Sequence, residues 1–330
     1  NVEDALWISI AIFRLATRHP FADPCIGNMT MEIQSASSTF NNVLTGNGTA
    51  VSEFSDLHIV DQLIAERGRT LVKHPSWPLL KPMLYRALQY RQAVKMADDV
   101  QGASGTGCFE YVSQMLGLDV HVHRGERIPA KGGFILISNH PTGIADGIAV
   151  FDLMKRVRND LVFFANRDAI RVNKNLAEII IPVEWRTSEK SHAKSRETLV
   201  RTNRAFKDER AIALFPSGRI AYWQGTGIKE RPWQATGIQL AKRYNVPIIP
   251  MNMQARNSWL FYLLAHRNPE LRDMTVFHEL LNKKGKRFDM TIGRPISPDV
   301  FEGDVQDETV KLQDYCEHAL KANPDAQFTL

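Results

Sequence analysis

The segment Phe134-Ile-Leu-Ile-Ser-Asn-His-Pro-Thr-Gly-Ile-Ala-Asp-Gly147 passes from an apolar run through a polar loop into a helical pattern. A short apolar run that ends at polar turn residues is typical of a buried β-strand, and we place the end of this strand at Ser138. A helix is expected to begin near Asp146. His140 would therefore be exposed where the strand ends, with Asp146 about one helical turn further along the chain.

The same alternation of strand-like and helical stretches continues through the rest of the chain. Further strands are predicted at residues 161–165, 179–183, 211–215, 247–251 and 288–292. Helices are predicted at residues 146–157, 192–207 and 234–244. Because this alternation is typical of βαβ units, we expect an α/β fold with a mainly parallel central sheet flanked by helices. Functional sites of such sheets usually lie in loops at the carboxyl ends of the strands, which is where His140 falls.

The chain before residue 121 has a different pattern. Residues 4–17 are strongly apolar, and residues 53–69 and 78–100 have helical periodicity, with a polar connection at residues 34–50. We therefore divide the chain into an N-terminal helical region, residues 1–120, and a second domain, residues 121–330. The sequence contains no uninterrupted apolar run of about 18 residues, so no bilayer-spanning helix is expected.

The composition and charge indicate a globular protein with an anionic partner. Apolar residues make up 44% of the chain and charged residues 23%, a balance that excludes a disordered protein. The net charge is only +5, but residues 155–243 contain 19 Lys and Arg against 9 Asp and Glu. A basic stretch of this kind favours phosphate groups, an anionic lipid surface or nucleic acid as the partner.

The cysteines and histidines do not indicate a metal site. Cys25, Cys108 and Cys316 are odd in number and widely spaced, which indicates reduced thiols and a cytoplasmic protein. His121 and His123 lie on one face of a probable strand, but the sequence places no third ligand near them. We therefore expect no bound metal.

A histidine followed by an acid in this kind of loop suits general base catalysis. A neutral imidazole can take a proton from an alcohol near neutral pH. A carboxylate at the other ring nitrogen fixes the tautomer and stabilises the imidazolium as it forms. His140 could thus activate an acceptor hydroxyl directly for attack on a thioester. Taken alone, the loop favours an Asp146 that only caps a helix and a His140 whose hydrogen bonds are satisfied within the loop, because Asp is common at helix N-termini.

Asn139-His140-Pro141 with Asp146 downstream resembles the first motif of the glycerolipid acyltransferase family, which includes the lysophosphatidic acid and glycerol-3-phosphate acyltransferases. That motif has four residues between the histidine and the aspartate, whereas this chain has five. Gly143 is expected to absorb the additional residue, because glycine adopts backbone conformations that other residues avoid.

Three later segments resemble the remaining blocks of the family, in the same order. Residues 181–186 end in Arg186, like the family's Ile-Asp-Arg. Residues 214–219, Leu-Phe-Pro-Ser-Gly-Arg, are similar to Phe-Pro-Glu-Gly-Thr-Arg, with Ser217 in place of the glutamate. Residues 246–250, Val-Pro-Ile-Ile-Pro, match the fourth block in full.

The resemblance implies which residues form the site. His140 and Asp146 would be catalytic, and the substrate-binding residues would be Asn139, Arg186, Ser217, Gly218 and Arg219. An arginine holds phosphate or carboxylate oxygens through two parallel hydrogen bonds, which suits Arg186 and Arg219 to an anionic acceptor. Gly218 would let the backbone approach that ligand closely.

The family also implies a reaction. It would be an O-acyltransferase that moves a fatty acyl group from acyl-CoA or acyl carrier protein to the hydroxyl of a lysophospholipid or glycerol-phosphate-like acceptor in membrane lipid biosynthesis. No cofactor or metal is implied, and no nucleic acid is expected as a partner. The protein would be cytoplasmic and peripheral at the inner face of the membrane.

Two other interpretations remain open. Residues 255–262 and 291–296 look like a bacterial branch often labelled hemolysin-like, similar to enzymes that acylate lyso-aminolipids such as lyso-ornithine lipid. Ser217 would suit such a different headgroup. The distant alternative is a non-catalytic protein that binds anionic membranes or nucleic acid, although no recognisable nucleic-acid module accompanies the charge. The apolar, aromatic residues 257–264 are predicted to form a core helix in preference to an interfacial one.

Overall fold

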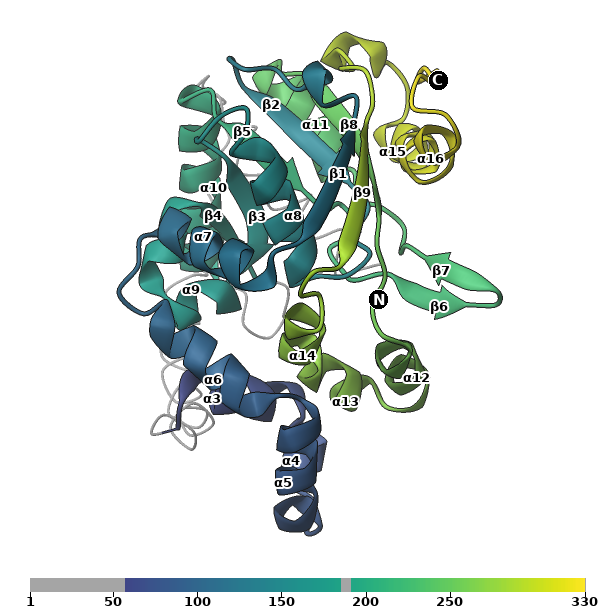
Figure 1. The fold of residues 1–330 in the computed structure, drawn as a ribbon. Coiled ribbons are helices and arrows are strands. Elements are labelled where there is room, and N and C mark those ends of the chain that lie inside the picture. The colour runs from purple at the N-terminus through teal and green to yellow at the C-terminus, as the bar shows by residue number, and fades with distance from the viewer. Residues whose placement is uncertain (1–56, 185–190, 330) are drawn as a thin grey trace, which may run out of the picture.

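The computed structural model describes residues 57–184 and 191–329 (Figure 1). The predictions for residues 4–17 and 34–50, and those for Cys25 and Arg186, lie outside the described residues. The described strands are β1 (Asp119–His123), β2 (Phe134–Ser138), β3 (Val162–Asn166), β4 (Ile180–Val183), β5 (Ala211–Leu214), β6 (Tyr222–Gln224), β7 (Gly227–Lys229), β8 (Ile248–Gln254) and β9 (Arg287–Ile292).

Helices surround these strands. The described α-helices are α3 (Ile59–Arg67), α4 (Arg69–Val72), α5 (Trp77–Ala87), α6 (Tyr90–Asp99), α7 (Gly105–Leu116), α8 (Ile144–Met154), α9 (Asp168–Val172), α10 (His192–Lys207), α11 (Thr236–Tyr244), α12 (Trp259–Arg267), α13 (Pro269–Met274), α14 (Val276–Leu281), α15 (Val305–Asp314) and α16 (Leu320–Ala322). Short 3-10 turns lie at Gly125–Arg127, Lys174–Glu178 and Pro298–Val300, and a π-helical turn joins α15 to α16 at Tyr315–Ala319.

Seven strands form one sheet in the order β1-β9-β8-β2-β5-β3-β4. The five strands from β8 to β4 run parallel, whereas β9 runs antiparallel to β8 and β1 pairs in parallel with β9. The predicted α/β fold with a mainly parallel central sheet flanked by helices is therefore confirmed. All six predicted strands and the three predicted helices of this region are present. The antiparallel hairpin formed by β6 and β7 was not predicted from the sequence.

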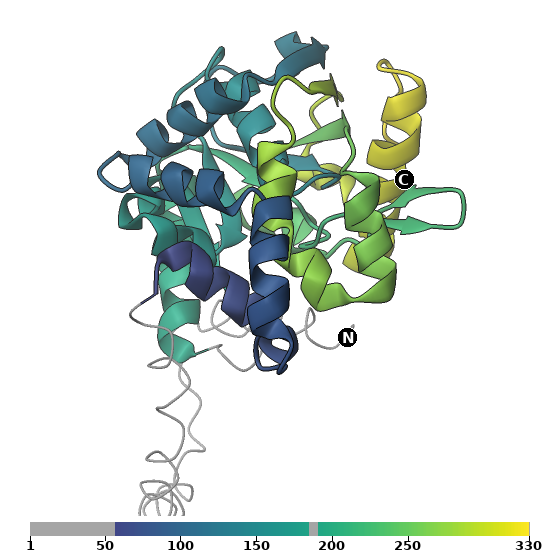
Figure 2. The same ribbon diagram turned by 60° about the horizontal axis from the view of Figure 1, so that its bottom comes forward.

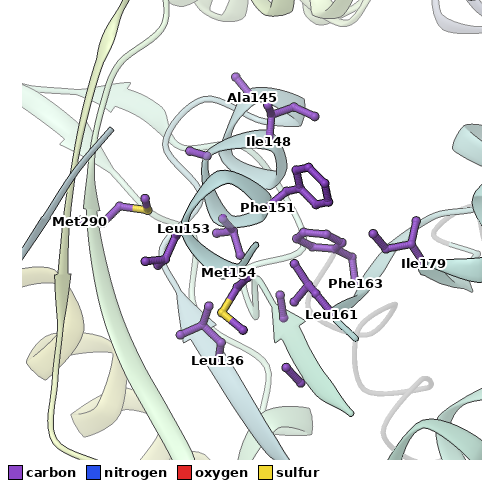
Figure 3. Packing of buried hydrophobic residues seen from close by; sticks show 14 of the residues in the cluster. Leu136, Ala145, Ile148, Phe151, Leu153, Met154, Leu161, Phe163, Ile179 and Met290 are labelled. Atoms are coloured by element: carbon purple, nitrogen blue, oxygen red, sulfur yellow. The ribbon is translucent and has the colours of Figure 1, made fainter. Parts of the chain in front are cut away.

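Strand β2 lies in the middle of the sheet and is buried on both faces. Phe134 and Leu136 pack into a cluster with the apolar residues of α8, part of which Figure 3 shows. Ile135 and Ile137 point to the opposite face and pack with residues of α10 and α11. Because side chains alternate along a strand, this continuous apolar run serves both layers of helices. The central position of β2 fixes where the loop that carries His140 begins.

The N-terminal helical region differs in detail from its prediction. The single helix expected over residues 78–100 is wrong, because α5 and α6 are separate helices. The chain turns between them at Gln89, whose φ of 55° lies in the left-handed region and cannot continue a helix. The domain boundary predicted after residue 120 falls inside β1, and α7 packs on α8 against the sheet.

Helix α12 is a further difference. The sequence favoured a core helix over residues 257–264, but within α12 only Phe261 is buried. Trp259 is 74% exposed and Leu263 is 41% exposed. The prediction of a core helix is therefore wrong, since Phe261 is the one buried residue of α12 and two of its large apolar side chains are exposed.

Candidate active site

The loop after β2 brings His140 and Asp146 together. Nδ1 of the His140 ring lies 2.9 Å from Oδ2 of Asp146, the distance of an ion pair. The carboxylate oxygen lies off the direction of a hydrogen bond from the ring, so Nδ1 has no directed hydrogen-bond partner. Asp146 is fully buried, whereas 18% of the His140 side chain is exposed. The ring can therefore meet a substrate while the acid stays covered.

Hydrogen bonds from the loop fix the Asp146 carboxylate. Oδ2 accepts the backbone N–H groups of Thr142 at 2.8 Å and of Gly143 at 2.9 Å, and Oδ1 accepts the Thr142 hydroxyl. These donors lie just ahead of α8, and Asp146 itself lies in the first turn of α8, where a carboxylate also interacts favourably with the helix dipole. Asp146 thus caps the helix and faces His140 at the same time, so the two interpretations of its role do not exclude each other.

Gly143 accommodates the additional residue of the His–Asp spacing. Its φ of 98° and ψ of −125° are closed to residues with a side chain. A Cβ atom built at this position would lie 2.7 Å from Cδ1 of Ile220. The backbone can therefore close the loop with five intervening residues and still set His140 against Asp146.

Phe215 forms one wall of the site beside the His140 ring. It follows β5, which pairs with β2 through Ile137 and Leu214. The two rings stack with centroids 4.3 Å apart and an angle of 21° between their planes. The pairing of β2 with β5 therefore positions the imidazole from one side.

The β6–β7 hairpin holds the backbone of His140 at both ends. Ahead of β6, the N–H of Ala221 donates to the carbonyl of His140 at 2.9 Å. Just after β7, Oε1 of Glu230 accepts the N–H of His140 at 2.8 Å. Both peptide groups of the histidine are thus bonded to the ends of one hairpin. No sequence pattern indicated this contact, because Glu230 lies outside the recognised motifs.

Glu230 is a buried carboxyl group next to the histidine. Its Oε2 atom has no hydrogen-bond partner. Burial raises its pKa to about 7, although the charge of His140 and the neighbouring Ser217 side chain act in the opposite direction. Glu230 also places a carboxyl group beside Ser217, where the family motif carries glutamate.

The raised pKa of Glu230 predicts a pH-dependent stability. Above the ordinary carboxyl pKa of 4.5 the unfolded chain loses this proton, while the folded chain keeps it up to about pH 7. Folding therefore becomes less favourable as the pH rises through this window. We expect Glu230→Gln to gain stability relative to the native chain between pH 5 and pH 8, by up to about 3 kcal/mol. Urea unfolding at several pH values measures the difference. The exposed Glu302→Gln is the control, and a pH-independent difference for Glu230→Gln would contradict the buried carboxyl.

Asn139 and Ser217 make contacts within the protein. Nδ2 of Asn139 donates to the carbonyl of Met253 at 2.8 Å, and its Oδ1 accepts the Met253 N–H at 2.7 Å. These bonds tie the loop after β2 to strand β8. The Ser217 hydroxyl donates to the carbonyl of Arg219 at 2.9 Å. Substrate contacts of Asn139 and Ser217 stay predictions, and the contacts seen give both residues a positioning role.

The other residues predicted to bind substrate are Gly218, Arg219 and Arg186. The N–H of Gly218, which has a φ of 60°, donates to the carbonyl of Phe215 and so is not free to hold a ligand. Arg219 is exposed next to this turn. Arg186 lies outside the described residues. Its role and that of Arg219 stay predictions.

Arg167 is a further candidate that the sequence motifs did not reveal. It directly follows β3, at the same edge of the sheet as His140, and its N–H donates to the carbonyl of Val183. Nη1 pairs with Glu197 at 2.6 Å, but Nε and Nη2 are buried without a hydrogen-bond partner. Two free donors of one guanidinium form a fork that fits phosphate or carboxylate oxygens.

Three further features concern possible metal ligands, cysteine thiols and helices that could span a membrane. Among residues 57–184 and 191–329, no group of three or more His, Cys, Asp or Glu side chains is arranged to hold a metal ion. Cys108 and Cys316 are buried free thiols. No helix within these ranges combines the length and the apolar character needed to cross a bilayer.

The sequence is similar to that of known acyltransferases. Residues 119–254 match the family model described as Acyltransferase. A lyso-glycine lipid O-acyltransferase of Phocaeicola vulgatus is 27% identical over 210 residues, which cover 62% of this chain and 74% of that protein. A protein of the same name from Bacteroides thetaiotaomicron is 24% identical over 204 residues, 60% of this chain and 73% of its own.

Solved structures are also similar to this chain. The crystal structure of the 1-acyl-sn-glycerophosphate (LPA) acyltransferase PlsC from Thermotoga maritima aligns with 82% of this chain and 99% of its own, with a TM-score of 0.44 and 13% sequence identity.

Proposed function

Because this chain is an acyltransferase related to the glycerolipid acyltransferase family, we propose that it transfers a fatty acyl group to the hydroxyl of a lysolipid. The observation that carries this proposal is the contact between His140 and Asp146 at the carboxyl edge of the sheet, with the imidazole accessible and the carboxylate buried. The donor is a thioester, either acyl-CoA or acyl carrier protein. This enzymatic function replaces the non-catalytic alternative.

The proposed mechanism uses His140 as a general base and then as a general acid. Nε2 of His140 takes the proton of the acceptor hydroxyl, while Asp146 stabilises the imidazolium that forms. The acceptor oxygen attacks the thioester carbon and forms the new C–O bond. The C–S bond then breaks, and the leaving sulfur takes the proton back from Nε2. The products are the O-acylated lipid and the free thiol of the carrier.

For the acceptor we propose a lysolipid with an amino-acid headgroup. Both related proteins are named for a lyso-glycine lipid, and the branch that residues 255–262 resemble also suggests an aminolipid. An amino-acid headgroup carries a carboxylate, which suits the two free donors of Arg167 and the exposed Arg219. This choice favours the lyso-aminolipid alternative over lysophosphatidate and glycerol phosphate as acceptors.

An acceptor panel tests the proposal. The full chain is incubated with palmitoyl-CoA or palmitoyl carrier protein and, separately, with lyso-glycine lipid, lyso-ornithine lipid and lysophosphatidic acid. We expect thiol release and a diacylated product, detected by mass spectrometry, at least about tenfold faster with an aminolipid, which is a difference of about 1.4 kcal/mol in transition-state binding. Arg167→Met should raise the KM for the acceptor more than the KM for the donor, and Arg167→Lys serves as its matched control.

The outcomes separate the parts of the proposal. Acylation of lysophosphatidic acid alone would replace the aminolipid acceptor but keep the reaction. No transfer to any acceptor from either donor would overturn the reaction itself. We further propose that the protein works at the inner face of the membrane as a peripheral protein, because its acceptor is a membrane lipid.

A further inference from the structure

Exposed apolar side chains gather on the β6–β7 hairpin and on α12. Trp223 on β6 is 52% exposed, and on α12 Trp259 is 74% and Leu263 is 41% exposed. The ring of Trp223 lies 5.9 Å from that of Tyr262, which joins the hairpin to α12. Figures 1 and 2 both show the hairpin and α12 on the same side of the molecule. We call Trp223, Trp259 and Leu263 the aromatic face.

The segments that carry the aromatic face have a charge of one sign. Residues 219–229 and 254–267 contain no Asp or Glu. Their lysine and arginines are all exposed, and within the described residues none of them forms an ion pair with a carboxylate; they are Arg219, Lys229, Arg256 and Arg267. Unpaired cations around exposed tryptophans fit a surface that is negative and has an apolar layer beneath.

We propose that the aromatic face and its surrounding cations dock the enzyme on an anionic membrane surface. Tryptophan favours the boundary between headgroups and acyl chains, because its ring is apolar and its N–H is polar. Each lysine or arginine near an anionic membrane strengthens binding by about fivefold. The inference deepens the proposed function, on which it rests, since a lysolipid acceptor would be held in that membrane.

The docking surface is directly connected to the catalytic histidine. The ends of the hairpin, at Ala221 and Glu230, hold both backbone groups of His140. A hairpin that rests on the membrane therefore places the accessible edge of the His140 ring close to the lipid headgroups. Among the described residues, the backbone groups of His140 bond only to the ends of this hairpin, which carries Trp223 of the aromatic face.

Helix α5 carries a second exposed apolar surface, which is the alternative to the aromatic face as a membrane contact. Leu79, Leu80 and Met83 are 83%, 42% and 68% exposed, so they could contact a membrane as well. We favour the aromatic face because it combines tryptophans, unpaired cations and the link to His140. Substitutions on α5 therefore form a separate part of the test.

Vesicle binding tests the docking surface. The full chain is sedimented with vesicles of pure phosphatidylcholine and with vesicles that contain one third phosphatidylglycerol. We expect binding to the anionic vesicles and at least about tenfold weaker binding for the double variant Trp223→Ser, Trp259→Ser. The variant Lys229→Glu, Arg267→Glu should lose binding to anionic vesicles by a similar factor, because two cations are reversed.

Two control variants are included in the vesicle-binding experiment. Val310→Ser on α15 removes an equally exposed apolar side chain, and Leu79→Ser, Met83→Ser removes the apolar surface of α5. Circular dichroism checks that every variant is folded. Undiminished binding of the tryptophan double variant, or loss of binding in the α5 variant alone, would overturn the proposal. Vesicle binding requires no turnover, so a chain that docks through these residues but transfers no acyl group would refute the reaction and leave the docking surface intact.

Discussion

The His140→Ala variant is expected to lose about 10³-fold in kcat with little change in the KM for either substrate. The alanine cannot accept the proton of the acceptor hydroxyl, and no other base in the described residues lies against Asp146. The ring is partly exposed and its backbone is held by Ala221 and Glu230. The fold should therefore survive the substitution. Thiol release from acyl-CoA, followed under saturating acceptor, measures the effect.

The matched control for this variant is Phe215→Leu. It removes the ring that stacks on His140 but leaves the imidazole in place. We expect a loss of no more than about tenfold, since only the orientation of the base is weakened. Full activity of the His140→Ala variant would remove the proposed mechanism, whatever the acceptor.

The second large effect is expected at Asp146. Asp146→Asn keeps an oxygen that can accept the N–H groups of Thr142 and Gly143, but it removes the negative charge that faces His140. We expect kcat to fall by roughly 10²-fold or more, because the imidazolium that forms on His140 loses the negative charge that stabilises it. Thermal unfolding should change little.

Asp146→Ala separates catalysis from helix capping. It should lose the same activity and in addition about 1–2 kcal/mol of unfolding free energy, because the first turn of α8 loses its acceptor. Urea unfolding and steady-state kinetics on both variants make the comparison. If Asp146→Asn kept native activity while Asp146→Ala lost only stability, Asp146 would be a helix cap and nothing more.

The fold was largely predictable because its signal is local. Strand β2 and its neighbours are short apolar runs between polar turns, and this pattern reports burial on both faces of a parallel sheet. The same reasoning failed for α12, which was predicted to be a core helix. A run of apolar residues shows which side chains are apolar, but it does not show whether another element covers them. The separation of α5 from α6 at Gln89 was also not predicted, because a single residue in the left-handed conformation does not change the helical periodicity of the sequence.

The site was predictable only where its residues are close in sequence. His140 and Asp146 lie in one loop, so the spacing alone suggested their contact. Glu230 reaches His140 from 90 residues away through the return of a hairpin, and Arg167 joins the same edge through strand order. Contacts of that kind depend on the tertiary arrangement, which no local pattern encodes.

The conformation of Gly143 has a consequence for recognising related enzymes. A signature that demands four residues between the histidine and the aspartate would pass over this chain, although its two side chains meet at 2.9 Å. A fifth residue is tolerated here because a glycine with a φ of 98° takes up the additional length. In sequences with the longer interval, a glycine three places after the histidine should therefore allow the same contact between histidine and aspartate, whereas a bulkier residue at that place should hinder it.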